Sequence, residues 1–429
     1  MFLRSLYTVV TATSTFSVPA LENTCPPIHH LRLENDQTFQ ISVFEDLHYG
    51  EAEDALWGPQ QDINSTRVMN AVLDTEVQQL VVLNGDLITG ENTHLKNSSL
   101  YLDEVVQPMV QRRLVWASTY GNHDSDFNLS RNAIFAREKI YSGSLTQCMV
   151  DGDSAGISNY YIPVYAENGA TSTSPVDPPA LLLWFFDSRR GNHYQQTDSQ
   201  GHSISLPNWV DQSVVDWFTT TRDSMTSERG RVVPSIAFVH IPITAMLAFQ
   251  DERKVDANRT PGVNDDVPLD AQGYTDDQGT ATEGFAYAGQ DHPFMEALVG
   301  TEGLMGVFSG HDHGDTWCQK WNTTIPGTNV TGNGRLNLCF GQHSGYGGYG
   351  SWIRGSRQIH LDFSPSSSSL SPLSSSSSAK KTISLPKLET WIRLEDGSES
   401  GRVVLNSTYG SEMDRYPAVR NRDSYGEDI

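Results

Sequence analysis

The chain has 429 residues, of which 37% are hydrophobic and 10% aromatic, and this composition excludes disorder over most of the length. Its 29 basic and 52 acidic residues leave a net charge of −23, which disfavours binding to nucleic acid or to an anionic membrane surface. The longest apolar run, at 180–186, is far shorter than the roughly 18 residues that a membrane span needs. The composition therefore predicts a soluble, acidic, globular protein.

The first twenty residues have the features of a signal peptide. Arg4 precedes a moderately apolar stretch, and the small residues before Leu21 suit a signal peptidase. We therefore predict a secreted or extracellular protein with a signal peptide at 1–20 and one domain at 21–429. Sequons for N-glycosylation support secretion. They begin at Asn64, Asn97, Asn128, Asn258, Asn322, Asn329 and Asn406.

The chain has 4 cysteines, an even set that allows three disulfide pairings. Cys318 and Cys339 flank a polar, Asn-rich loop between two predicted strands, which favours a bond between them. The remaining pair would then be Cys25 and Cys148. The alternative is a set of buried free thiols.

Short apolar runs alternate with helical patterns, which is typical of an α/β fold. A helical spacing of apolar residues predicts a helix over 65–79, and Pro207 is expected to open another with an apolar face from Val210 to Phe218. The predicted strands lie, in chain order, at 39–45, 80–84, 114–118, 181–186, 236–239, 304–308 and 336–340.

Two later segments break this alternation. Residues 250–283 are acidic and have no apolar period, so they predict a long loop that can lie over a site as a lid. Residues 364–380 are dominated by serine and predict a disordered, low-complexity insertion. Strand-like runs at 391–394 and 402–405 follow it, so the insertion is expected to interrupt a sheet.

Side chains that suit metal binding follow five of the predicted strands. Because the carboxyl ends of strands in an open α/β sheet meet at one crevice, these segments should converge. They offer carboxylate, amide and imidazole groups, a mixture that suits Zn, Fe or Mn. A single motif of this kind usually contains only an ordinary core or surface histidine. Five of them in series, each at the end of a strand, indicate a metal site. They read Asp46-Leu47-His48, Gly85-Asp86, Gly121-Asn122-His123-Asp124, His240 and Gly310-His311-Asp312-His313.

This series resembles the calcineurin-like metallophosphoesterase superfamily, and the segment 341–357 is similar to a fungal and plant branch called purple-acid-phosphatase-like. The resemblance implies an αββα sandwich of two mixed β-sheets flanked by helices, with a dinuclear metal site. By position, it implies that one ion is held by Asp46, His48 and His313, the other by Asn122, His240 and His311, and both by Asp86.

One position departs from true purple acid phosphatases, which have a tyrosine three residues after the bridging aspartate and owe their colour to its bond with Fe(III). Here this position is Thr89, and His48 in the first motif supplies a ligand instead. The expected cofactors are therefore two divalent or mixed-valence ions of Mn, Zn or Fe.

The implied reaction is hydrolysis of a phosphomonoester by a hydroxide that bridges two ions. His123 is not assigned to a metal and is the expected general acid. Asp124 would either orient its ring or cap the following segment. The candidate substrate contacts, each with an ordinary surface or packing role as the alternative, are Arg189 beside Arg190, Tyr346, Tyr349 and Arg354.

The expected substrate is a small phosphoester or a phosphoprotein. Two other functions stay open at this point. The same pair of ions could serve a phosphodiesterase that acts on nucleotides or lipid headgroups. The fold could also serve as a catalytically silent binding module, which predicts eroded ligands, and none of the implied ligands is missing.

Overall fold

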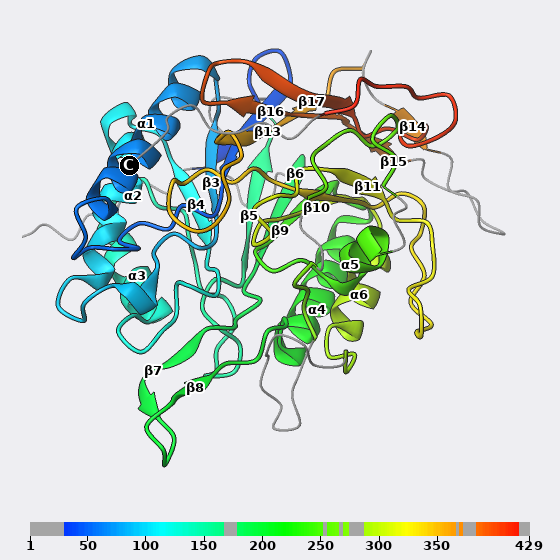
Figure 1. Ribbon diagram of the computed structural model, residues 1–429. Helices are drawn as coiled ribbons and strands as arrows, with labels where there is room; N and C mark the ends of the chain where they lie inside the picture. Colours follow the sequence, from blue (N-terminus) through cyan, green and yellow to red (C-terminus); the bar gives the residue numbers. More distant parts are fainter. Residues whose placement is uncertain are drawn as a thin grey trace, which may run out of the picture.

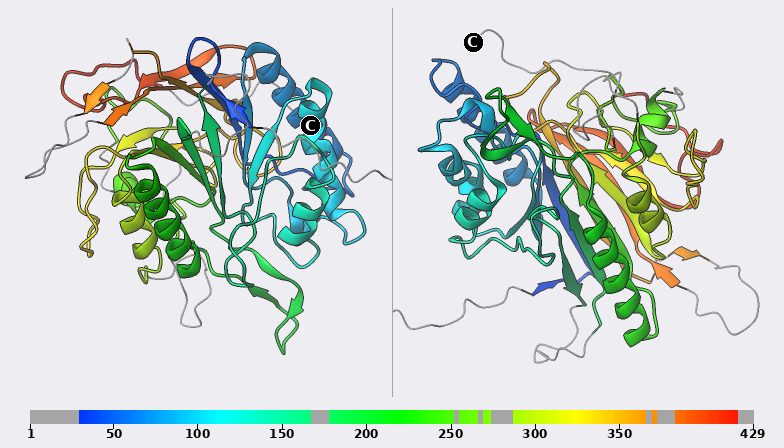
Figure 2. Two further views of the ribbon diagram at one scale, coloured as in Figure 1. Left: turned by 180° about the vertical axis from the view of Figure 1, so that it is seen from behind. Right: turned by 90° about the horizontal axis from the view of Figure 1, so that it is seen from below.

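The computed structural model in Figure 1 describes residues 30–166, 178–251, 255–265, 269–273, 287–365, 369–371 and 383–419. Two large β-sheets face each other in the centre, and helices lie outside them on both sides (Figures 1 and 2). This confirms the αββα sandwich. The expected signal peptide at 1–20 lies outside the described residues.

The first large sheet is mixed. It runs in the order β17 (Glu399–Val404), β16 (Lys387–Leu394), β13 (Gly355–Asp362), β2 (Thr38–Phe44), β3 (Leu80–Asn84) and β4 (Trp116–Thr119). The strands β2, β3 and β4 are parallel, whereas β13 pairs antiparallel with both β2 and β16. The helices on this side are α1 (Gly58–Thr75), α2 (Tyr101–Arg112) and α3 (Arg131–Glu138), with 3-10 turns η1 (Gly90–Asn92) and η2 (Ser98–Leu100).

The second large sheet is also mixed, and its four central strands β6, β9, β10 and β12 are parallel. It runs in the order β1 (Leu31–Arg32), β5 (Tyr160–Tyr165), β6 (Leu181–Phe186), β9 (Ser235–Val239), β10 (Leu304–Ser309), β12 (Asn337–Phe340) and β11 (Cys318–Lys320). The helices on this side are α4 (Gln212–Arg229), α5 (Thr244–Asp251) and α6 (His292–Val299). A hairpin of β7 (Asn192–Thr197) and β8 (Ser203–Ser205) projects at the bottom of Figure 1.

The sequence of β6 explains the layered packing. Successive side chains of a strand point to opposite faces. Leu181, Leu183 and Phe185 belong to the core between the sheets. Leu182 and Trp184 belong to a second core with residues of α4 and α6. Both faces of this strand are therefore buried, and its sequence is a continuous apolar run.

Several sequence-based boundaries are corrected. The helix expected at 65–79 begins at Gly58, within a polar first turn that the apolar spacing could not reveal. The helix expected from Pro207 begins at Gln212, because the Asp211 side chain accepts a hydrogen bond from the Ser213 N–H and caps it.

The two irregular segments are described only in part. Within 364–380, the short strand β14 (Ser369–Ser371) pairs with β15 (Ile383–Leu385). Within 250–283, α5 continues to Asp251, and the Gln272 N–H donates to the Pro242 carbonyl. The other residues of both segments lie outside the described part of the chain.

One expected disulfide is present. Cys318 and Cys339 are bonded and join paired positions of β11 and β12. Cys148 is a free, exposed cysteine, which does not bear out its pairing with Cys25, a residue outside the described ranges. Among the described residues, no helix has the length and apolar character required to span a bilayer.

Candidate metal centre

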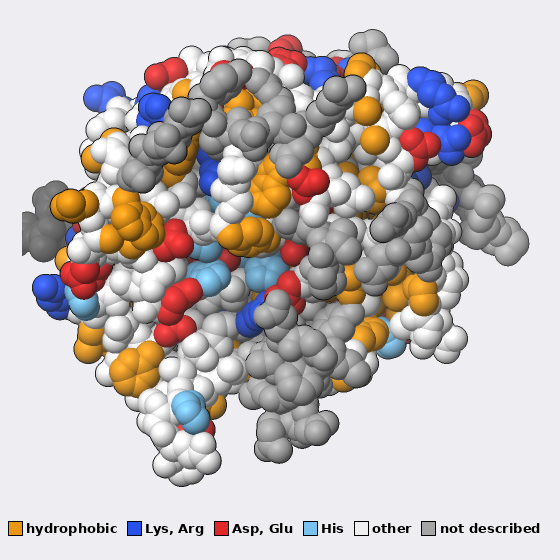
Figure 3. Space-filling model, in the orientation of Figure 1, with side chains coloured by type: hydrophobic (Ala, Val, Ile, Leu, Met, Phe, Trp, Pro, Cys, Tyr) orange, Lys and Arg blue, Asp and Glu red, His pale blue; other side chains and the backbone are white. Residues whose placement is uncertain are grey.

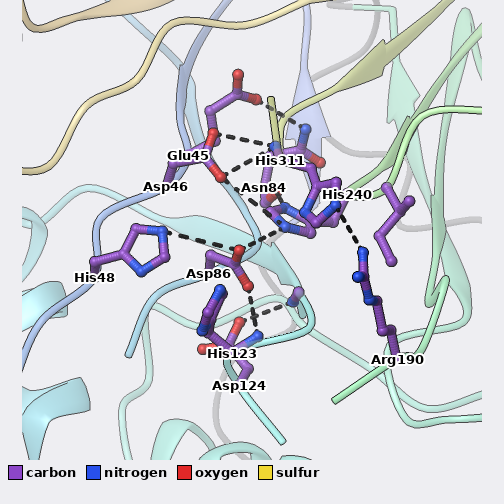
Figure 4. A network of polar contacts seen from close by, with 12 residues as sticks. Glu45, Asp46, His48, Asn84, Asp86, His123, Asp124, Arg190, His240 and His311 are labelled. Carbon is purple, nitrogen blue, oxygen red and sulfur yellow. Dashed lines mark hydrogen bonds and ion pairs between the residues drawn. The ribbon is translucent and has the colours of Figure 1, made fainter. Parts of the chain in front are cut away.

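The five motif segments follow the carboxyl ends of β2, β3, β4, β9 and β10, and they meet where the two large sheets adjoin (Figure 4). Their side chains form two groups that could each hold an ion. In each group, one ligand atom per residue lies within 4.8 Å of the others. The groups are Asp46, His48 and His313, and Asp86, His240 and His311.

The backbone around these groups is held in an unusual conformation. Four of the motif residues have positive φ angles, at 53° for Asp46, 51° for His48, 51° for Asp86 and 78° for His311. Backbone hydrogen bonds tie the first two loops together, because Leu47 N–H and His48 N–H both donate to the Asp86 carbonyl, at 2.8 and 3.0 Å. Such left-handed residues cost about 1–3 kcal/mol each and concentrate at functional sites.

Two glycines allow this close approach. A Cβ atom on Gly85 would clash with the His240 ring, and one on Gly121 would clash with the Asp86 carboxylate. Neither position therefore has room for a side chain.

Three imidazoles are fixed through their Nδ1 atoms. His48 Nδ1 lies 3.1 Å from Thr89 Oγ1, His240 Nδ1 lies 2.8 Å from the Asn84 carbonyl, and His313 Nδ1 lies 2.9 Å from the Tyr349 carbonyl. Partners of this kind set the ring orientation of metal-binding histidines. The Nε2 atoms are left for the centre, where those of His48 and His313 approach to 3.2 Å.

Two buried atoms in the centre fit a cation. Asn122 Oδ1 and His240 Nε2 make no hydrogen bond, although His240 Nε2 lies 2.9 Å from Asp86 Oδ2. Burial, and to a lesser degree the charge of Asp86, raise the pKa of Asp46 to about 7, although His240 opposes this shift. Asp86 Oδ2 is also 3.9 Å from His48 Nε2, so this carboxylate lies between the two groups. The donor set therefore suits two transition-metal ions.

His123 lies beside the centre and is held by an acid that the sequence did not reveal. Its Nδ1 is 2.5 Å from Glu91 Oε1, and its backbone N–H donates to Asp86 Oδ1 at 2.8 Å. Burial lowers the pKa of His123, but the carboxylates of Asp86 and Glu91 outweigh burial and raise it to about 10. Bound cations would oppose this rise. The only sequence signal for Glu91 is an acid in the turn after Asp86, which is not distinctive.

Asp124 does not orient the His123 ring. Its Oδ1 accepts hydrogen bonds from the backbone N–H groups of Leu87 and Ile88, both at 3.0 Å. Its Oδ2 accepts a hydrogen bond from the Gly121 N–H at 2.8 Å. It is completely buried. Asp124 therefore braces two site loops, and the N-cap of the following helix α3 is Ser130 instead.

Arg190, rather than the predicted substrate contact Arg189, lies next to the metal-ligand groups. Arg189 is buried, and its guanidinium donates to the carbonyls of Trp209 and Ser154. Arg190 instead reaches the centre, where its Nη1 lies 3.2 Å from His311 Nε2 and contacts Asp270 (Figure 4).

Arg354 and Tyr346 do not point into the centre as expected. Arg354 is buried and donates to the carbonyls of Trp352 and Gly350, so it braces the glycine-rich loop. The Tyr346 hydroxyl donates to Glu395. Tyr349, in contrast, lines the site.

A cavity of about 700 Å³ opens over these groups. Figure 3 shows acidic side chains around the histidines near the middle of this face. The described residues that line the cavity are His48, Glu51, Asp86, Thr89, Glu91, Asn92, His123, Asp265, Asp270, His311, Asp312, His313, Gly348 and Tyr349.

Comparisons with known proteins agree with this geometry, although no family model matches. Probable inactive purple acid phosphatases 29 and 28 of Arabidopsis thaliana are 24% and 25% identical, over 85% and 77% of this chain and 85% and 76% of their own. Phosphatase DCR2 of Saccharomyces cerevisiae is 24% identical over 52% of this chain and 38% of its own. The chain is thus similar in sequence to purple-acid-phosphatase-like proteins, in agreement with the resemblance to the calcineurin-like metallophosphoesterases.

Among solved structures, a dimetal phosphatase from Danio rerio is 11% identical to this chain, with a TM-score of 0.47, and the match covers 86% of this chain and 99% of that one. A yellow lupin purple acid phosphatase is 10% identical, with a TM-score of 0.42, over 86% of this chain and 53% of that one.

We expect this protein to be colourless when loaded with iron. Thr89 contacts the His48 ring, and the Tyr349 hydroxyl accepts a hydrogen bond from His313 N–H at 3.1 Å, so neither supplies a phenolate to an ion. A visible absorption spectrum of the iron-loaded protein should show no tyrosinate charge-transfer band. A purple preparation would show that a tyrosine reaches the metal and that the proposed ligand set is wrong.

Proposed function

We propose that this chain is a metal-dependent phosphomonoesterase. The observation that carries the proposal is the convergence of both ligand groups, with Nε2 atoms directed inward and Asn122 Oδ1 left without a protein partner. Two bound ions would supply Lewis-acid activation of water and of the phosphoryl oxygens. The proposed ligands are Asp46, His48 and His313 for one ion, Asn122, His240 and His311 for the other, and Asp86 for both.

The surrounding side chains would handle the proton and the phosphoryl charge. Glu91 holds His123 Nδ1, which leaves Nε2 to donate a proton to the leaving oxygen. Arg190 lies beside His311 and can donate hydrogen bonds to a phosphoryl oxygen. We propose Arg190, rather than Arg189, as the phosphate-orienting cation.

Two alternatives need a direct test. The first is a phosphodiesterase, which would use the same centre. The second is a catalytically silent binding module, which comes into question because the plant relatives are named as probable inactive phosphatases. Against a silent module, the proposed ligands and an acid-held histidine are all present in this chain.

Metal analysis combined with two chromogenic substrates separates these functions. The purified protein, loaded in turn with Mn, Zn and Fe, should bind two ions and cleave nitrophenyl phosphate faster than bis(nitrophenyl) phosphate. A faster diester reaction would favour the phosphodiesterase. Two bound ions without cleavage of either substrate would favour the silent module. A chelator-treated sample is the matched control.

Replacing Glu91 by glutamine should move the pH profile. Removing this carboxylate lowers the pKa of the His123 imidazolium, because an opposite charge at hydrogen-bond distance is lost. If protonated His123 is required, the basic limb of kcat/KM should shift to lower pH by about 1–3 units. Rescue by Glu91→Asp would support a charge effect. An unchanged profile would contradict the role of Glu91 in positioning and charging His123.

We also propose that the protein enters the secretory pathway. The Cys318–Cys339 disulfide suits an oxidising compartment. Four sequon asparagines, namely Asn258, Asn322, Asn329 and Asn406, are exposed, whereas Asn128 is half-buried and donates through Nδ2 to the Thr93 carbonyl. We expect glycosidase treatment of the protein from a eukaryotic host to release glycans from the exposed sites. A host-cell protein without glycans and with reduced cysteines would contradict this location.

A further inference from the structure

Resting on the proposed phosphomonoesterase function, we infer that Arg131 is a positioning residue, which holds Arg190 at the phosphoryl site. Arg131 is the first residue of α3, and only 5% of it is exposed. It is not among the described residues that line the cavity. Its effect on a substrate must therefore pass through the turn that follows β6 and carries Arg190.

The turn after β6 has an unusual backbone. Arg189, Arg190 and Gly191 follow one another with φ angles of 63°, 66° and 80°. Such left-handed angles are unfavourable for residues other than glycine, so the surroundings must hold this turn in place. The direction of Arg190 depends on the turn, because the neighbouring Arg189 side chain points elsewhere and donates to the carbonyls of Trp209 and Ser154.

Arg131 and Asp187 hold this turn together. Arg131 Nη2 donates to the Arg189 carbonyl at 2.7 Å and to the Arg190 carbonyl at 3.1 Å. Its Nε lies 3.3 Å from Asp187 Oδ1, and this oxygen also accepts the Arg189 N–H at 2.8 Å. Both members of this ion pair are buried. The backbone of the turn is therefore fixed by a pair of charges that water does not reach.

The same guanidinium also contacts a loop of the metal centre. Arg131 Nη2 donates to the Gly121 carbonyl at 2.7 Å, and Gly121 directly precedes the proposed ligand Asn122. The turn itself rests on this loop, because a Cβ atom on Gly191 would clash with the carbonyls of Asn122 and Ser125. Arg131 therefore sets the position of Arg190 relative to a proposed metal ligand.

Arg190 brings positive charge to a cavity that otherwise offers little of it. The described residues that line the cavity include no lysine or arginine, whereas a phosphoryl group is negatively charged. Arg190 Nη1 lies 3.2 Å from His311 Nε2, beside the second ligand group (Figure 4). Arginine binds phosphate through several hydrogen bonds in a fixed geometry, so a displaced backbone weakens the contact. The position of the turn should therefore decide the affinity for phosphate.

Binding of inorganic phosphate to the metal-loaded protein tests this inference without turnover. We expect Arg190→Ala to weaken phosphate binding roughly tenfold in calorimetry, because charge-assisted hydrogen bonds are lost. Arg131→Gln should weaken it by a similar factor while elemental analysis still finds both metal ions. In the Arg190→Ala background, Arg131→Gln should add no further loss, because a residue that acts only through another is fully coupled to it in a double-mutant cycle.

Three results would overturn the inference. A wild-type phosphate affinity in Arg131→Gln would show that Arg190 does not need Arg131. Equal losses in the wild-type and Arg190→Ala backgrounds would show that Arg131 acts on the whole centre. Loss of metal in Arg131→Gln would show that it acts on the Asn122 loop instead.

A second variant and a control guard against a general loss of folding. Removing one member of a buried ion pair is destabilising, so Arg131→Gln is repeated together with Asp187→Asn, which leaves no unpaired buried charge. This double variant should show the same coupling to Arg190, and an additive effect would contradict the inference. Arg137→Gln is the matched control on α3, because Arg137 pairs with Asp103 on α2. It should leave phosphate affinity unchanged, and an equal loss there would also count against the inference.

The experiment separates this inference from the proposed function. A protein that binds phosphate with this coupling but cleaves no phosphomonoester would overturn the phosphomonoesterase and leave the positioning role intact. A protein that cleaves nitrophenyl phosphate but shows additive effects of Arg131 and Arg190 would overturn the positioning role alone. If the metal-loaded wild type binds no phosphate, both proposals fail.

Discussion

Replacing Asp86 by alanine should release both metal ions and abolish turnover. This carboxylate lies 2.9 Å from His240 Nε2 and 3.9 Å from His48 Nε2, so it is placed between the two ligand groups. Nearby His240 and His123 keep its pKa well below the usual range in spite of burial, so it carries a negative charge toward both ions. Elemental analysis and an assay with nitrophenyl phosphate measure the two losses together.

Asp86→Asn separates loss of charge from loss of shape. An asparagine can still accept the His123 N–H that Asp86 Oδ1 accepts at 2.8 Å, so the loop should keep its conformation. We expect this variant to fold, as judged by circular dichroism and its melting curve, and still to lose metal. Two ions per chain in both variants would show that Asp86 does not bridge them.

Replacing His123 by alanine should leave both ions bound and slow the hydrolysis of alkyl phosphates strongly. A general acid contributes roughly 10²–10⁴-fold in rate, which corresponds to about 3–5 kcal/mol of activation free energy. The proton matters most for a poor leaving group. Nitrophenyl phosphate, whose leaving group is stable as an anion, should therefore lose much less activity.

His94→Ala is the matched control, because His94 is also partly exposed and has acidic partners, Glu53 and Asp54, outside the cavity. We expect this variant to behave like the wild type on both substrates. For His123→Ala, equal losses on both substrates would indicate that the imidazole stabilises charge on phosphorus instead. Loss of metal would make His123 a ligand.

The strands that sequence predicts well are those buried by apolar side chains. The limits of β3 and β6 match the predicted runs, because both faces of these strands are covered by apolar side chains. The strand β13 was not predicted, because Ser356, Arg357 and Gln358 are polar although they are buried, and only Ile359 and Leu361 add buried apolar side chains. Arg357, for example, is almost fully buried, and donates to Thr390 Oγ1 at 2.9 Å and to the Thr316 carbonyl at 2.7 Å. Partners so distant in the chain leave no local pattern.

In the candidate centre, too, some residues could be predicted from the sequence and others could not. The motifs at strand ends were enough to name the side chains that the structure brings together, because the topology of the sheets gathers them. The contacts made by loops were not predictable. Arg189 and Arg190 both have left-handed backbones, with φ of 63° and 66°, and this turn decides which of them reaches the centre. Glu91 reaches His123 from the η1 turn, which has no distinctive sequence.

The left-handed backbone at four motif positions restricts how this centre could be redesigned. Aspartate, asparagine and histidine tolerate positive φ better than other side chains, whereas β-branched and bulky residues are strained there. Exchanging Asp46, His48, Asp86 or His311 for cysteine or tyrosine would therefore oppose the loop geometry as well as the coordination chemistry. Asn122, His240 and His313 are not among the residues with positive φ. An engineer who wants a softer or redox-active metal should begin at these three positions.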